Sequence, residues 1–212
     1  MRITKIESQQ KRPGRKNIYA DGKFVAGVSA ETLLKLALRP GDEIGPEQLK
    51  AIQAAESAQS ARNTALRFLS TRPRTEREIR SKLREKEFSD EEISSVIQDL
   101  HQSGLLDDRQ FARLFVRNAM TLRPAGAPVL RRKLLLLGVD RKTIDEIIAE
   151  ELSGESQTET ARELARRFVA KARAARKEDQ KLRARLSGYL ARRGFPWDTI
   201  RDATREALGP DE

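Results

Sequence analysis

A set of four apolar residues with one spacing occurs three times along this chain. Ile79, Leu83, Phe88 and Ile93 are separated by four, five and five residues. The same spacing recurs at Leu130, Leu134, Val139 and Ile144, and again at Leu186, Leu190, Phe195 and Ile200. Repetition at such intervals is typical of stacked supersecondary units, none of which can bury its own apolar face alone. The pattern therefore predicts an array of modules that offers surface to a large partner.

Two capping boxes mark helix starts in the first unit. Thr75-x-x-Glu78 and Ser89-x-x-Glu92 each combine a hydroxyl with a carboxylate three residues later, a pattern in which both groups bind free backbone amides. They predict helices over 75–86 and 90–102, preceded by a helix over 61–71. In the second and third units a glycine, Gly138 or Gly194, ends the middle helix. Each unit is therefore expected to contain three helices.

The predicted fold is mainly α-helical. We expect three tandem three-helix repeats that form an elongated array, preceded by a small N-terminal β-hairpin and helix region. The expected boundaries are 1–55 for the N-terminal region and 56–104, 105–153 and 154–212 for the three repeats.

The N-terminal region carries strand and turn signals. Residues 1–27 contain strand-like runs, and Asp21-Gly22 between two of them is a strong hairpin signal because both turn positions need a positive φ. The basic run from Lys11 to Lys16 is expected to form another turn. Ser29 should open a short helix, and Gly45-Pro46-Glu47 should open the next, since proline is well tolerated in a first helical turn.

The charge of the chain points to a polyanionic partner. The 212 residues carry a net charge of +10, and the isoelectric point is near 10.1. The chain has no cysteine, no long apolar run and no signal-peptide pattern, so we expect a cytoplasmic protein that does not engage a membrane.

The charge is unevenly distributed. Residues 162–193 contain twelve Lys and Arg but three Asp and Glu, whereas residues 87–99 contain five acidic residues and no basic one. A surface with both signs suits a composite of protein and nucleic acid better than bare DNA.

The residues needed for catalysis are scarce. The chain has a single histidine, His101, and no glycine-rich phosphate-binding loop. Asp107-Asp108 could be imagined as metal ligands, but a helix cap before Arg109 is the favoured interpretation because no further ligands stand at suitable spacing. We therefore expect no enzymatic activity, no cofactor and no metal.

A combination of motifs identifies a family. It consists of Thr75-Glu76-Arg77-Glu78-Ile79 with Lys82-Leu83 and Lys86, then Ser103-Gly104-Leu105-Leu106-Asp107-Asp108 with Phe111-Ala112, and finally Gly126, Leu130, Leu134 and Gly138-Val139. Together these segments resemble the RecX family, bacterial regulators of the RecA recombinase. The resemblance is strong over 61–150 and extends over 155–208 through the third repeat.

The resemblance implies both a fold and a function. Members of the family fold as tandem three-helix repeats, lodge in the groove of the RecA–single-stranded-DNA filament, and inhibit strand exchange and ATP hydrolysis in DNA repair and recombination. The implied partners are the RecA filament and, weakly and without sequence specificity, single-stranded DNA; we expect a monomer. One departure is Lys86-Glu87, where the family commonly has Lys-Gly, so a differently shaped turn is expected there.

Basic residues on all three repeats are the candidates for contacting the filament or its DNA, because contacts from Lys and Arg to phosphate are independent of sequence. Taken singly, each is better explained as part of a solvated helix face, whereas the cluster of basic residues on the third repeat is better explained by binding. The candidates are Arg72, Arg74, Arg77, Arg80, Arg84, Arg131, Arg132, Lys133, Arg166, Lys171, Lys181, Arg183, Arg185, Arg192 and Arg193.

Aromatic residues are not expected to stack on bases. Five phenylalanines fall at helical core spacing and should pack internally, whereas the role of Trp197 is open. Those five are Phe68, Phe88, Phe111, Phe115 and Phe168.

Three other functions compete with RecA regulation. A helix-turn-helix DNA-binding regulator would need base-reading side chains, but the helix over 90–102 has Glu91, Glu92 and Asp99 instead. A sequence-independent DNA- or RNA-binding protein would fit the charge, and nuclease treatment would release its partners. A purely structural scaffold leaves the segregation of charge unexplained.

Overall fold

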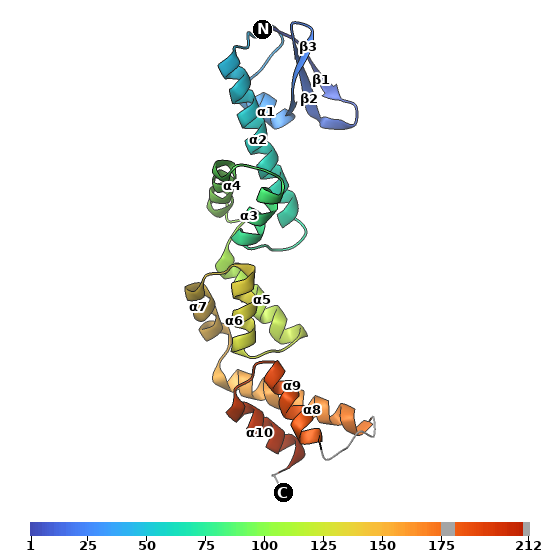
Figure 1. Ribbon diagram of the computed structural model, residues 1–212, viewed down its shortest axis with the longest axis vertical. Helices are drawn as coiled ribbons and strands as arrows, with labels where there is room; N and C mark the ends of the chain where they lie inside the picture. The colour runs from blue at the N-terminus through green and yellow to red at the C-terminus, as the bar shows by residue number, and fades with distance from the viewer. Residues whose placement is uncertain (175–180, 210–212) are drawn as a thin grey trace. The chain divides into compact units, whose positions relative to one another are not determined.

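The computed structural model describes residues 1–174 and 181–209. The described residues form three strands and ten helices, shown in Figure 1. They fall into two compact units. The first unit comprises Met1–Arg74 and Glu78–Leu106, and the second comprises Thr75–Arg77 and Asp107–Glu212.

The first unit begins with an antiparallel sheet of three strands, β1 (Ile3–Gln9), β2 (Arg12–Ala20) and β3 (Lys23–Ser29), in the order β1-β2-β3. The hairpin at Asp21-Gly22 is confirmed, with φ values of 48° and 77°. The predicted basic turn is largely wrong. Residues from Arg12 onward belong to β2, where Lys16 pairs with Ser8 of β1, because the chain reverses within the two residues before Arg12.

Two helices cover the sheet, α1 (Ala30–Lys35) and α2 (Pro46–Leu69), and both start where predicted. Glu56 of α2 holds the region together. One of its carboxylate oxygens accepts hydrogen bonds from the Ser29 amide (2.6 Å) and the Thr32 hydroxyl (2.8 Å), and the other lies 2.7 Å from the Arg15 guanidinium. A buried aliphatic core lies beneath, made of Ile3, Ile18, Val28, Ile44 and Ile52.

Three further cores correspond to the three repeats. The first repeat consists of the end of α2, α3 (Glu76–Glu85) and α4 (Asp90–Gln102); the second of α5 (Asp108–Leu122), α6 (Ala127–Leu137) and α7 (Arg141–Glu151); the third of α8 (Gly154–Ala174), α9 (Leu182–Arg192) and α10 (Trp197–Leu208). The equivalent leucines Leu83, Leu134 and Leu190 are each 0% exposed, which confirms the alignment of the repeats.

The recurrent spacing of four, five and five residues has a physical cause in the turn after each middle helix. In the first repeat, the amide of Phe88 donates to the carbonyl of Leu83, and the amide of Glu87 donates to that of Arg84. This is the Schellman pattern, which brings an apolar residue after the helix onto one in its last turn. Phe88 also precedes the N-cap Ser89 and so stands five residues before Ile93, the arrangement of a hydrophobic staple.

The same turn closes all three middle helices. The amide of Val139 donates to Leu134, and the amide of Phe195 donates to Leu190. The residue in the left-handed conformation is Glu87 (φ 63°), Gly138 (φ 95°) or Gly194 (φ 80°). The expectation of a different turn at Glu87 is therefore wrong: the packing of Phe88 keeps the turn, and the glutamate adopts a backbone conformation that costs a side chain about 1–2 kcal/mol.

Replacing Glu87 by Gly should therefore stabilise the protein. The substitution removes the steric cost of the left-handed conformation, and the greater flexibility of glycine in the unfolded chain offsets part of that gain. We expect the free energy of unfolding to rise by about 0.5–1 kcal/mol in urea titrations. A decrease would show that the Glu87 side chain contributes more than its backbone strain costs.

Within the second unit, the start of one middle helix contacts the end of the next at equivalent positions. The amide of Gly126, before α6, donates to the carbonyl of Arg193 after α9 at 2.8 Å. Thr75 stands eight residues before Leu83, as Gly126 stands eight residues before Leu134, and its hydroxyl donates to the carbonyl of Leu137 at 2.7 Å.

The capping box predicted at Ser89 and Glu92 is present.

Candidate interface for nucleic acid and protein

The candidate cations of the first repeat are mostly engaged inside the first unit. Arg72 lies 2.6 Å and Arg74 3.3 Å from the carboxylate of Glu78, and Arg74 also lies over the ring of Phe68, 3.8 Å from its centroid. Arg84 pairs with Asp90 at 3.1 Å. These three residues stabilise the repeat, and each would have to leave or share an internal partner to bind a phosphate.

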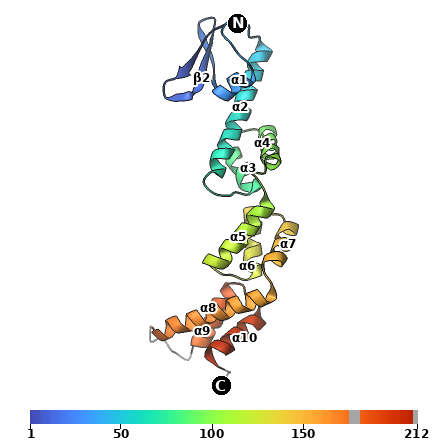
Figure 2. The ribbon, with the colours of Figure 1, turned by 180° about the vertical axis from the view of Figure 1, so that it is seen from behind.

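In the second repeat, arginines of α5 that were not among the candidates form a ladder with glutamates of α7, a helix that lies beside α5 (Figure 2). Arg113 lies 2.7 Å from Glu150, and Arg117 lies 2.7 Å from Glu151. Hydrogen bonding to Arg113 lowers the pKa of Glu150, and hydrogen bonding to Arg117 lowers the pKa of Glu151. The positive charge of α5 is thus neutralised locally.

The ladder makes stability depend on pH. Because the pKa of Glu151 is lower in the folded chain than in the unfolded chain, the unfolded chain binds more protons and stability rises with pH through this range. The contribution is complete above the ordinary glutamate pKa of about 4.3 and is lost as pH falls through the lowered value. Glu151→Gln should therefore lower the melting temperature at pH 7, with a difference that shrinks below about pH 4. A difference in melting temperature that does not change with pH would contradict this role of Glu151.

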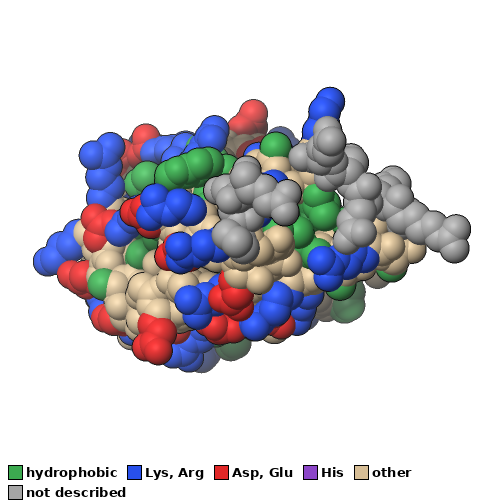
Figure 3. All heavy atoms as spheres, turned by 90° about the horizontal axis from the view of Figure 1, so that it is seen from below, with side chains coloured by type: hydrophobic (Ala, Val, Ile, Leu, Met, Phe, Trp, Pro, Cys, Tyr) green, Lys and Arg blue, Asp and Glu red, His purple; other side chains and the backbone are tan. Residues whose placement is uncertain are grey.

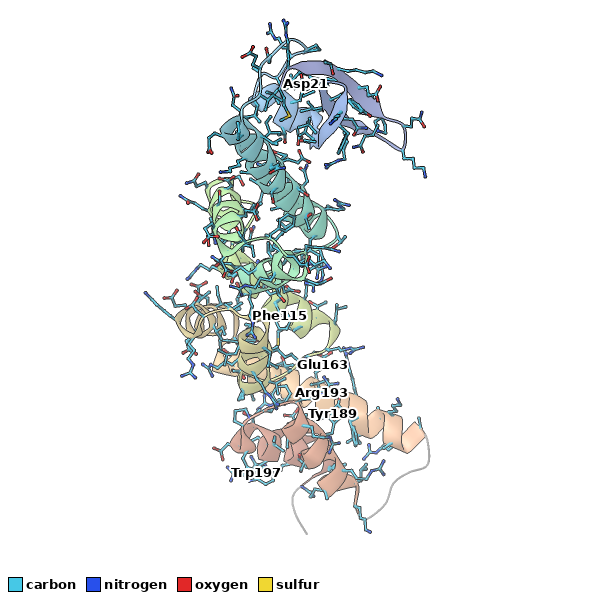
Figure 4. All side chains as sticks on the ribbon, turned by 45° about the horizontal axis from the view of Figure 1, so that its top comes forward. Asp21, Phe115, Glu163, Tyr189, Arg193 and Trp197 are labelled. Atoms are coloured by element: carbon cyan, nitrogen blue, oxygen red, sulfur yellow. The ribbon has the colours of Figure 1, made fainter. Side chains whose placement is uncertain are left out.

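Several candidates of the third repeat also have internal partners. Arg166 lies 2.6 Å from Glu159, and Arg183 donates to the carbonyl of Gly209 at 2.7 Å. Arg193 donates to the carbonyl of Pro124 at 2.6 Å, and its guanidinium lies over the ring of Tyr189, 4.8 Å from the centroid. Figure 4 labels the side chains of Arg193 and Tyr189. Arg193 therefore fastens the third repeat to the second.

The remaining candidates differ in availability. Arg131 pairs with Asp145 at 2.8 Å, and Arg80, Lys181 and Arg185 also interact within the chain. Five candidates are exposed, and their side chains make no hydrogen bond or ion pair to any residue that the structure describes: Arg77, Arg132, Lys133, Lys171 and Arg192. Figure 3 shows Lys and Arg side chains spread over one face with Asp and Glu side chains between them. This mixture of charges agrees with the many ion pairs formed by the other basic residues.

Other residues singled out in the sequence have structural places. Asp107 caps α5 by accepting from the amides of Arg109 and Gln110, as predicted. His101 is exposed in the last turn of α4, and Phe111 lies in the core of the second repeat. Trp197, in the first turn of α10, is 66% exposed.

Over residues 1–174 and 181–209, no helix is long and apolar enough to span a membrane.

A cleft of about 390 Å³ in the first unit lies between β3, α2 and Phe88. Its charged lining is Arg15 and Glu56, which already bind each other and, through Glu56, the start of α1. The cleft therefore offers no catalytic pair of groups.

Known proteins match the chain throughout. The RecX N-terminal domain matches residues 1–45, and the first, second and third RecX three-helix domains match residues 61–100, 107–148 and 155–204. A regulatory protein RecX of Bacillus velezensis is 33% identical over 204 residues, which cover 96% of this chain and 76% of the relative. The chain belongs to the RecX family. RecX of Clostridioides difficile is likewise 33% identical, over 99% of this chain and 97% of its own length.

Solved RecX structures share the fold. A crystal structure of regulatory protein RecX covers 95% of this chain with a TM-score of 0.74 and 29% identity. RecX from Lactobacillus salivarius covers 72% of this chain with a TM-score of 0.64 and 25% identity. The relatives in Bacillus velezensis and Clostridioides difficile are named as regulatory proteins.

Proposed function

We propose that this RecX family protein regulates RecA by binding the RecA–single-stranded-DNA filament and inhibiting strand exchange and ATP hydrolysis. The observation that carries the proposal is the set of exposed cations, such as Lys171 and Arg192, that no described carboxylate neutralises. These charges persist in a chain where most other arginines are paired internally. They are available to an external polyanion.

The charge distribution favours a filament over free DNA. The first turn of α4 holds Asp90, Glu91 and Glu92, which would repel phosphates if that helix entered a DNA groove. Binding to single-stranded DNA alone is therefore weak and independent of sequence. The protein acts in the cytoplasm as a monomer and needs no cofactor, metal or catalytic activity of its own.

Neutralising Lys171 and Arg192 together should weaken binding to single-stranded DNA and reduce its salt dependence. Each phosphate contact with a single strand contributes about 0.7 to the slope of log K against log salt concentration. We expect the Lys171→Gln, Arg192→Gln variant to have a slope smaller by about 1.4, measured by fluorescence anisotropy over a salt series. Affinity for the RecA filament should fall in parallel.

The matched control removes the same charge elsewhere. Arg141 and Lys142 are exposed at the start of α7 and lie outside the candidate set. The Arg141→Gln, Lys142→Gln variant should keep the wild-type slope. Equal effects of the two variants would mean that net charge alone governs binding. Equal affinity of the wild type for bare DNA and for the filament would favour a plain nucleic-acid-binding protein.

A further inference from the structure

The outer corner of α6 combines an exposed apolar side chain with two available cations. Leu136 is 69% exposed, and it lies one helical turn after Arg132 and three residues after Lys133. Residues three and four apart are neighbours on a helix surface, so Leu136 stands between the two basic side chains. Neither cation has an acidic partner in the part of the chain that the structure describes. We call Arg132, Lys133 and Leu136 the α6 corner.

At the equivalent corner of the first repeat, the basic side chain is neutralised by a residue of the same helix. The residues of this corner, counted from the buried leucine, are Ser81, Lys82 and Glu85. Lys82 and Glu85 form an ion pair of 2.9 Å, so a glutamate that neutralises the lysine stands where the second repeat has Leu136.

The same corner of the third repeat has no exposed aliphatic side chain, although its Arg192 is an available cation. Its equivalent residues are Gly188, Tyr189 and Arg192. Tyr189 packs against Phe168 with ring centroids 4.9 Å apart, and Arg192 lies back over Gly188, whose added Cβ would meet its guanidinium at 3.3 Å. Of the three corners, only that of the second repeat leaves an apolar side chain exposed between two available cations.

We infer that the α6 corner docks an acidic protein segment in which carboxylates flank an apolar side chain. Arg132 and Lys133 would bind the carboxylates of the segment. Burial of Leu136 against the apolar residue of the segment would add favourable binding free energy, and DNA phosphates offer no such contact. The inference rests on the proposed function, in which that segment belongs to a RecA subunit of the filament. The second repeat then contacts protein, while Lys171 and Arg192 of the third contact DNA.

A photocrosslinking experiment tests which component the corner touches. The chain has no cysteine, so Leu136→Cys can be labelled with benzophenone maleimide at a single site. Leu122→Cys is the matched control, because Leu122 is a similarly exposed leucine (78%) at the end of α5. On RecA–single-stranded-DNA filaments we expect adducts to RecA from position 136 and few or none from position 122. Adducts to DNA, or equal yields at the two positions, would overturn the inference.

Affinity measurements separate this inference from the proposed function. Leu136→Ser and the Arg132→Gln, Lys133→Gln pair should each weaken cosedimentation with the filament by about tenfold. Arg131→Gln should not, because the charge of Arg131 is already taken by Asp145. If the wild type sediments with the filament and Leu136→Ser does so equally well, the docking surface is wrong but the proposed function stands. If the wild type does not sediment, both are wrong.

Discussion

Replacing Leu134 by Ala should lower the free energy of unfolding by about 2–5 kcal/mol. Leu134 is completely buried in the core of the second repeat, where truncation removes apolar contacts and leaves a cavity that close-packed neighbours cannot fill. Urea titration followed by circular dichroism would measure the change. Leu83 and Leu190 hold equivalent buried positions, so the same truncation there should have an effect of similar size.

Leu136→Ala on the same helix is the control for this prediction. Its side chain is mostly exposed, so its truncation should change stability by no more than about 0.5 kcal/mol. If Leu134→Ala and Leu136→Ala were equally stable, the alignment of the three repeats would be wrong.

A methyl group added at Gly126 should disrupt the junction between the second and third repeats. Its Cβ would lie 2.0 Å from the carbonyl oxygen of Gly194, a backbone atom that cannot rotate away. The φ of Gly126 is −71°, a value open to any residue, so the effect is steric. We expect Gly126→Ala to destabilise the protein by about 3 kcal/mol, the upper part of the range for overpacked sites.

Gly188→Ala should change the free energy of unfolding in the opposite direction. Gly188 lies inside α9, and an added Cβ would meet only the flexible end of Arg192 at 3.3 Å. Alanine is favoured over glycine within a helix by about 0.5–1 kcal/mol, so this variant should be more stable than the wild type. Wild-type stability of Gly126→Ala would show that the contact between Gly126 and Gly194 is not tight.

The features predicted well from the sequence were those set by local chemistry. The spacing of Leu83, Phe88 and Ile93 reflects a helix-ending turn and a hydrophobic staple, both of which involve residues within five positions of one another. The Asp107 cap and the Asp21-Gly22 hairpin are similarly local. Such features can be predicted from the sequence because they do not depend on contacts with distant residues.

The features that were missed depend on residues far apart in the chain. Arg193 was a candidate for binding DNA, yet its guanidinium binds the carbonyl of Pro124, 69 positions away. Arg131 finds Asp145 on the neighbouring helix. A basic residue on a helix face gives no sign in the sequence of which carboxylate folding will bring beside it. The candidate set could therefore be drawn up from the sequence but not reduced to its available members.

Glu87 shows tertiary packing overriding a local preference. Glutamate disfavours a positive φ, which argued for a different turn after α3. Burial of the neighbouring core around Leu83 and the hydrogen bond from Phe88 to Leu83 impose the same turn as in the other repeats. The repeat architecture was therefore a better guide to this turn than the identity of the residue in it.

The most direct test of the proposed function is a titration of this protein into RecA hydrolysing ATP on single-stranded DNA. We expect sub-stoichiometric amounts to slow hydrolysis. The Lys171→Gln, Arg192→Gln variant should need a higher concentration for the same effect, whereas the Arg141→Gln, Lys142→Gln control should not. If hydrolysis continued at its original rate with the folded wild-type protein in excess over RecA, the protein would not be an inhibitor of RecA.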